Sequence, residues 1–145
     1  MTRGALHHIE LYVSDLERSV AFWGFLLGQL GYRPYQEWDD GMSWRLGPTY
    51  LVFVQAPDDT DFDRRRPGLN HLAFHVDTAE EVEELVAHLR SRGTRLLYED
   101  RHPYAGGEDH YAAFMEDPDG VKVELVADDR TTEPPRPPTA PDGRA

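Results

Sequence analysis

Apolar and polar residues alternate along residues 6–13, near the start of the chain. A period of two predicts a β-strand with one apolar side and one polar side. The polar side would carry His8, Glu10 and Tyr12, while the aliphatic residues between them would pack on a helix.

That helix follows directly, because apolar residues recur at intervals of three and four over residues 16–30 and stop before Gly31. Ser14, with Glu17 three residues later, is typical of a capping box at the start of such a helix. Three short extended segments come next, separated by turn formers, at residues 32–37, 42–46 and 50–55. The first part of the chain, about residues 5–56, therefore predicts a βαβββ module.

The same order repeats over about residues 69–127. An alternating strand from residue 70 places His71 where His8 stands in the first module, and the interval between the two histidines also separates Val13 from Val76. A second helix begins at a capping box and ends before a glycine, as the first does. Its capping residues are Thr78 and Glu81, and three further strands are predicted at residues 95–99, 111–116 and 121–126.

These elements predict an α+β fold in which two βαβββ modules form a curled mixed-sheet cleft. We expect one domain over residues 1–128. Residues 129–145 lack apolar periodicity and are dense in proline, so we expect an extended or disordered tail there.

The polar sides of three strands carry the candidate chemistry. If each strand packs its apolar side on a helix, then His8, His71 and Glu124 point to the opposite face. Two imidazoles and a carboxylate suit one divalent ion, which would be zinc, nickel, iron(II), manganese or cobalt, and they leave coordination positions open for a substrate. The residues do not select among these metals.

Composition narrows the class of partner. The formal net charge of −12 argues against nucleic acid, which requires a basic surface, and favours a small-molecule substrate. Cysteine is absent, so thiolate chemistry and cysteine-type zinc sites are excluded. The sequence has neither a signal-like start nor a long apolar segment, and we therefore expect a cytoplasmic protein without membrane contact.

Three segments, HHIELYVSDLERSVAFW, NHLAFHV and EDPDGVKVELV, resemble the motifs of the vicinal oxygen chelate superfamily, which includes glyoxalases, bleomycin-resistance proteins and extradiol dioxygenases. The resemblance covers about residues 5–127. Position by position, it implies that His8, His71 and Glu124 are metal ligands. It also implies paired βαβββ modules around a cleft, and a metal that chelates adjacent oxygens of the substrate.

The chain departs from each branch that it resembles. Glyoxalase I enzymes take a fourth ligand, a glutamate, from the last strand of the first module, where this chain has Val52 and Val54. Extradiol dioxygenases place a tyrosine ten residues before the final glutamate, and Phe114 stands there. The lysine- and serine-bearing loop of the fosfomycin-resistance enzymes is replaced by HPYAGGEDH. The reaction type therefore stays open.

Glu10 and His110 are the candidate acid–base residues: Glu10 is two residues from His8 on the same strand face, and His110 shares its parity with Phe114 and faces the cleft if Phe114 does. The candidate substrate-binding residues are His75, Tyr50, Trp44, His102, Tyr104 and Phe114. We interpret the chain as a metal-dependent enzyme of the lyase, isomerase or dioxygenase type that forms a homodimer. The alternative is a non-catalytic protein that binds a drug or metabolite in the manner of bleomycin-resistance proteins.

Overall fold

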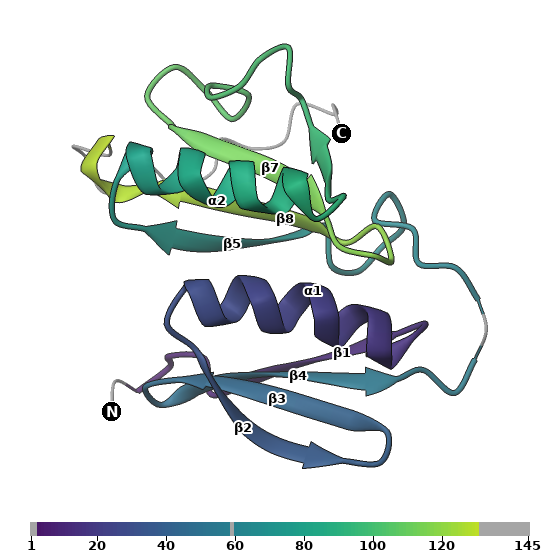
Figure 1. Cartoon of the computed structure of the whole chain (residues 1–145). Helices are drawn as coiled ribbons and strands as arrows, with labels where there is room; N and C mark the ends of the chain where they lie inside the picture. The colour runs from purple at the N-terminus through teal and green to yellow at the C-terminus, as the bar shows by residue number, and fades with distance from the viewer. Residues whose placement is uncertain (1–2, 59, 131–145) are drawn as a thin grey trace. The chain divides into compact units, whose positions relative to one another are not determined.

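The computed structural model describes residues 3–58 and 60–130, which divide into two compact units. Among the described residues, the first unit comprises 3–58, 60–62 and the turn at 117–120, and the second comprises 63–116 and 121–130. In each unit one helix lies against one face of a four-stranded mixed sheet, as Figure 1 shows. The predicted α+β class and the two βαβββ modules are thereby confirmed.

The first sheet has the strand order β1-β4-β3-β2, with β1 and β4 parallel and the other neighbours antiparallel. The long connection that a parallel pair needs is supplied by α1 and the two intervening strands. The bounds are β1 His8–Val13, α1 Leu16–Gln29, β2 Arg33–Trp38, β3 Gly41–Leu46 and β4 Thr49–Gln55.

The start of α1 differs from the sequence prediction. Asp15 is the N-cap, and its carboxylate accepts a hydrogen bond from the Arg18 backbone N–H. The Ser14 hydroxyl donates instead to Asp119 of the turn at 117–120, and the Ser14 backbone N–H donates to the same carboxylate over 3.1 Å. The expected Ser14 and Glu17 capping box is therefore wrong, because a partner distant in sequence engages the serine.

The core of the first unit lies between α1 and the sheet. Trp23 is fully buried, stacks on Phe53 with ring centroids 4.9 Å apart, and donates its indole N–H to Asp117. Each fully buried side chain of the size of Leu26 stabilises the fold by about 1.5–3 kcal/mol. The same core contains Trp44, which is 3% exposed and lies 3.1 Å from the position that a Cβ on Gly24 would take.

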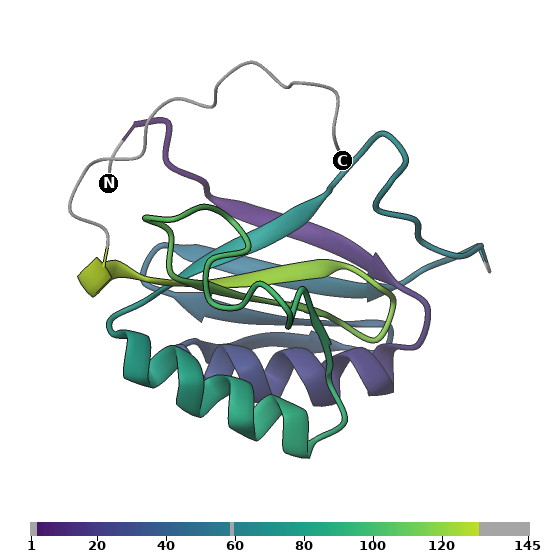
Figure 2. The same ribbon diagram turned by 90° about the horizontal axis from the view of Figure 1, so that it is seen from above.

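The second sheet repeats this arrangement with the order β5-β8-β7-β6, in which β5 and β8 are parallel. The capping box of Thr78 and Glu81 at the start of α2 is confirmed, with both of its hydrogen bonds present. The bounds are β5 His71–Val76, α2 Ala79–Ser91, β6 Arg95–Leu97, β7 Ala112–Glu116 and β8 Lys122–Ala127. Figure 2 shows the long connection between β6 and β7 as a green segment beside β7.

A short 3-10 helix, Asp128–Arg130, closes the described part of the chain. The Asp129 carboxylate accepts from the Ala79 backbone N–H at the start of α2, and the Asp129 N–H donates to the Asp77 carbonyl. Asp129, where we had expected the tail to begin, is thus bonded to the residues at the start of α2. The rest of that expected tail, residues 131–145, lies outside the described residues.

Candidate functional site

The second sheet has one face covered by α2 and one open face. Val123, Leu125 and Met115 are buried on the α2 side. Since side chains alternate along a strand, the residues between them stand on the open face. Glu124 of β8 lies on that face directly opposite Phe114 of the antiparallel neighbour β7.

Glu124 is the centre of the polar group on this face. It is 5% exposed, which is costly for a carboxylate unless hydrogen bonds or cations compensate. Its Oε2 lies 3.1 Å from Nε2 of His71, and its Oε1 contacts Nε2 of His110. The structure thus brings together two of the three predicted ligands, and it adds the predicted acid–base residue His110.

The His71 ring is oriented from its other side by Asn70, whose Oδ1 lies 2.7 Å from His71 Nδ1. An amide oxygen only accepts, so Nδ1 carries the proton and donates. Nε2 then faces the Glu124 carboxylate, and either a proton on Nε2 or a metal ion bound by both groups makes this contact favourable. Metal-bound histidines are commonly held by such a partner on the second ring nitrogen.

The separation of these two groups is that of a hydrogen bond or a close ion pair. The His71 and Glu124 atoms are 3.1 Å apart, whereas nitrogen and oxygen ligands about 2.0–2.2 Å from one zinc ion at tetrahedral angles lie about 3.3–3.6 Å from each other. A shared ion would therefore move the two side chains apart by a few tenths of an ångström.

A glycine makes room for His110. A Cβ on Gly106 would lie 2.6 Å from His110 Cδ2, closer than real Cβ contacts, so a side chain at 106 would displace the imidazole. The His110 backbone N–H donates to the Gly107 carbonyl, which closes the turn before β7. Asn70 and Gly106 were both missed by the sequence analysis, although Asn70 directly precedes the histidine of the second motif.

The connection between β6 and β7 is attached to α2 through Glu83. The Tyr111 hydroxyl donates to Glu83 Oε1 over 2.7 Å, and His102 Nε2 lies at the same distance from that oxygen. Burial raises the pKa of Glu83, but the hydrogen bonds from Tyr111 and His102 outweigh it and hold the pKa below its ordinary value. A cavity of about 90 Å³ borders this contact. His102 thus contacts the helix side of its unit.

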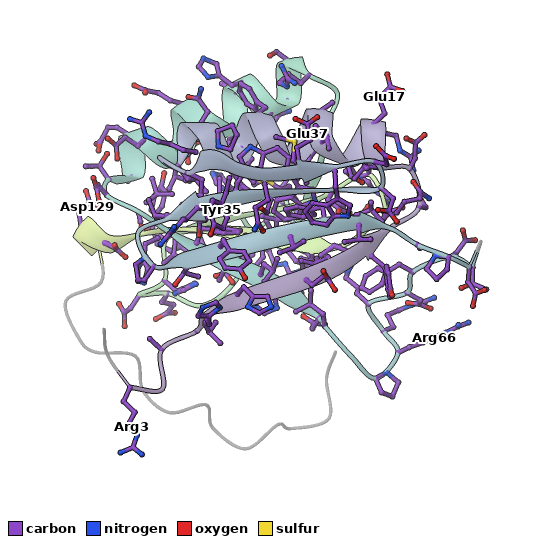
Figure 3. All side chains as sticks on the ribbon, turned by 90° about the horizontal axis from the view of Figure 1, so that it is seen from below. Arg3, Glu17, Tyr35, Glu37, Arg66 and Asp129 are labelled. Carbon is purple, nitrogen blue, oxygen red and sulfur yellow. The ribbon has the colours of Figure 1, made fainter. Side chains whose placement is uncertain are left out.

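His8 stands on the open face of the first sheet, because Leu11 and Val13 on the opposite side of β1 are buried. Figure 3 views this open face directly, with Tyr35 lying on it. The His8 ring stacks on Tyr50, its cross-strand partner, with centroids 4.8 Å apart and planes 5° apart. His8 Nδ1 lies 2.9 Å from Nδ1 of His7. The His8 side chain is exposed and is held by an aromatic neighbour.

Glu10 lies on the same face of β1 as His8 and opposite Val52 of β4. It is exposed, and across residues 3–58 and 60–130 it has neither a hydrogen-bond nor an ion-pair partner. Val52 and Val54 are the residues of β4 that stand on this same face beside Glu10 and Tyr12, so β4 supplies no carboxylate next to His8.

The remaining candidates are distributed over both units. Trp44 belongs to the core beneath α1, which corrects its assignment as a pocket aromatic. His75 is exposed and its Nδ1 lies 2.7 Å from Asp128. Tyr104 is 48% exposed and its ring meets Tyr111, while Phe114 meets the ring of Tyr98 on the open face of the second sheet.

Within the part of the chain that the structure describes, no group of three histidine, aspartate or glutamate side chains has an arrangement that could hold a metal. His71 and Glu124 are together in the second unit, and His8 is in the first. None of the described helices is long and apolar enough to cross a membrane.

Comparison with known proteins gives one family. Residues 5–125 match the model of the Glyoxalase/Bleomycin resistance protein/Dioxygenase superfamily. The protein YqjT of Bacillus subtilis is 54% identical over 125 residues, covering 84% of this chain and 98% of that protein. A lactoylglutathione lyase of Escherichia coli O157:H7 is 32% identical over 127 residues, covering 83% and 90%. The crystal structure of a candidate glyoxalase from Bacillus halodurans is 56% identical, with a TM-score of 0.85, covering 86% and 96%.

Proposed function

Because the chain belongs to the Glyoxalase/Bleomycin resistance protein/Dioxygenase superfamily, we propose that it is a metal-dependent enzyme acting on a small substrate with adjacent oxygens. His8, His71 and Glu124 would hold one divalent ion. The observation that carries this proposal is the His71 and Glu124 pair, in which Asn70 fixes the imidazole so that its free nitrogen faces a buried carboxylate. When bound, the ion supplies positive charge beside the substrate oxygens.

Glu10 is the group best suited to move a proton. It is exposed, lacks a partner among the described residues, and lies two residues from His8 on the same strand face, which is about 7 Å between Cα atoms. A free carboxylate at that distance can take a proton from a carbon next to a substrate carbonyl. His110, in contact with Glu124, would return a proton to the substrate or hold Glu124 in place.

The position of Glu10 also compensates for a missing residue. The glutamate that glyoxalase I enzymes use would stand at Val52 or Val54 on β4, and Val52 is the cross-strand partner of Glu10. Neighbouring strands lie about 4.8 Å apart, so Glu10 presents a carboxylate at the same rung, one strand away. Because position 114 is phenylalanine, the tyrosine acid of ring-cleaving dioxygenases is absent. Proton transfer of the lyase or isomerase type is therefore the reaction that these residues support best.

One observation favours the alternative of a binding protein. The rings of Tyr35 and Tyr50 lie 5.3 Å apart on the open face of the first sheet, and the Arg45 guanidinium lies 5.0 Å from the centroid of Tyr35. Such an aromatic surface would suit a flat small molecule that stacks on the rings. A protein that only sequesters a ligand, however, has no use for the buried His71 and Glu124 pair. The expected homodimer stays a prediction that the mass in solution would test.

The proposal is tested by metal analysis of protein purified without chelators or metal-affinity resin. About one equivalent of a transition metal is expected in the parent. The same content is expected in the control His75→Ala, which removes a histidine on the same face of β5 as His71. His71→Ala and Glu124→Ala should both lose the metal. If the parent binds none of zinc, nickel, iron(II), manganese or cobalt after reconstitution, the proposed enzyme is refuted. A loaded parent would then be assayed with 2-oxoaldehydes, catechols and thiol acceptors.

A further inference from the structure

A second polar cluster lies on the open face of the second sheet, beside the metal-ligand pair. Lys122 Nζ is 5.7 Å from the centroid of the Tyr98 ring and 6.0 Å from that of Phe114. The Arg101 guanidinium is 4.8 Å from the Tyr98 centroid. The two rings meet edge to face, 5.5 Å apart. Two cations and two aromatic rings are thus gathered in one place.

Neither cation of this cluster is neutralised by a carboxylate of the described chain. Glu116, the cross-strand partner of Lys122, is engaged by Arg64 at 2.5 Å and by Arg95 at 3.6 Å. Glu99, near Arg101 in sequence, is paired with Arg90. With 27 acidic residues against 15 basic ones, two neighbouring cations without acidic partners run against the composition of the protein.

The backbone at Tyr98 is strained in a way that builds the cluster. Its φ of 56° lies in the left-handed region, where no other non-glycine among the described residues is found. Such a conformation is unfavourable for a residue with a Cβ and occurs preferentially at functional sites. The Arg101 N–H donates to the Tyr98 carbonyl over 3.0 Å, which closes the turn that returns Arg101 to the tyrosine ring.

The cluster adjoins the proposed metal site. Lys122 precedes Glu124 by two residues on β8, so both side chains stand on the same face, about 7 Å apart between Cα atoms. Phe114 is the cross-strand partner of Glu124. A small molecule that reaches Glu124 and His71 would therefore also reach Lys122 and the two rings.

We propose that Tyr98, Arg101, Phe114 and Lys122 form a subsite for an oxyanion of the substrate, either a carboxylate or a phosphoryl group. Arginine and lysine supply charge-assisted hydrogen bonds to such groups, and the rings cover the adjoining apolar carbons. The inference rests on the proposed function in naming this ligand as the substrate. It assigns a substrate that has metal-chelating oxygens at one end and a negative charge at the other.

The test uses metal-free protein, so that it does not depend on the metal site. Benzoate, its neutral isostere benzamide, and inorganic phosphate are titrated and followed by calorimetry or by NMR. Benzoate is expected to bind at least about tenfold more tightly than benzamide, since charge-assisted hydrogen bonds are roughly twice as strong as neutral ones. The ratio of benzoate to phosphate affinity then identifies the kind of oxyanion, and either preference supports the subsite.

Variants locate the binding. Lys122→Gln and Arg101→Gln are each expected to weaken benzoate at least about fivefold, and Lys122→Arg should retain binding within about twofold. The matched control is Arg45→Gln, which removes a cation from above a tyrosine ring in the first unit and should leave the affinity unchanged. Thermal melts confirm that each variant is folded.

The proposal is overturned if benzoate and benzamide bind equally, or if Lys122→Gln and Arg101→Gln bind benzoate as the parent does. Its failure is separate from that of the metal site. Charge-dependent benzoate binding in a protein that takes up no metal would support the subsite and refute the proposed enzyme. Metal binding without charge-dependent benzoate binding would do the reverse.

Discussion

The strand pairs β1/β4 and β5/β8 are both parallel, each pairs six residues, and each begins with a histidine on its open face. On the rung two residues further along, the first pair has Glu10 opposite Val52, and the second has Ala73 opposite Glu124. Each module therefore has one carboxylate at this rung, but on opposite strands. The two modules thus share the pairing of their strands but differ in which strand of the pair carries the carboxylate.

The surroundings of the two carboxylates differ as well. Glu124 is almost fully buried between two imidazoles, which restricts it to one position. Glu10 is exposed, and the described residues supply it with no partner. We propose that the buried carboxylate serves as the metal ligand, and that the exposed carboxylate, which has no partner among the described residues, serves as the base.

The largest effect is expected for Glu124→Gln. An amide cannot provide the negative charge that balances a divalent ion, so bound metal should be lost and activity should fall to that of the metal-free protein. Elemental analysis and steady-state kinetics measure the two losses. Retention of a full equivalent of metal would contradict the assignment of Glu124 as a ligand.

Glu10→Gln should separate the two roles. We expect kcat to fall about 10²–10⁴-fold, as for loss of a general base, while the metal content stays at the parent level. The contrast with Glu124→Gln is the informative result. Loss of metal would instead make Glu10 the fourth ligand, and unchanged kcat would remove it from the mechanism.

Gly106→Ala should act through His110, since the new Cβ cannot coexist with the imidazole in its present position. Activity is expected to fall about 10–100-fold, the range for residues that support a metal ligand, with metal still bound. Gly28→Ala is the control in the first unit, because a Cβ there meets open space. It should stabilise α1 by up to about 1 kcal/mol and leave kcat unchanged.

Glu83→Gln should have the smallest effect, and one that depends on pH. The folded-state pKa of Glu83 lies below its unfolded value, so its contribution is fully present above the unfolded pKa and is lost as the pH falls through the folded pKa. We expect a loss of about 0.5–1 kcal/mol near neutral pH, because the group is largely solvated. Urea unfolding at neutral and strongly acidic pH measures it, and an equal loss at both would contradict the account.

Much of the fold was predictable because its signals are local. The two helices and the alternating strands follow from spacing alone, and the Thr78 and Glu81 capping box is closed by residues three apart. Ser14 misled the prediction because its partner, Asp119, is 105 positions away. Trp44 was misplaced because its packing against Gly24 and Phe53 depends on the register between β3 and β4, which no single segment specifies.

The residues of the candidate site also divide into those that the strand pattern predicted and those that it did not. Strand parity correctly placed Glu124 and Phe114 on one face, and it anticipated that His110 would join them. The role of Gly106 and the contact of His102 with Glu83 were not predicted. Both residues lie in the connection between β6 and β7, where no repeating pattern of apolar residues indicates which way a side chain points. Asn70 was visible in the second motif, but only its geometry shows that it orients His71.

The most direct test of the central claim is X-ray absorption spectroscopy at the K-edge of the bound metal, comparing the parent with His8→Ala and His71→Ala. The account predicts two imidazole ligands and oxygen donors about 2.0–2.2 Å from the ion in the parent, and one imidazole in any variant that still retains metal. A parent spectrum without imidazole, or one that His8→Ala and His71→Ala both leave unchanged, would contradict it.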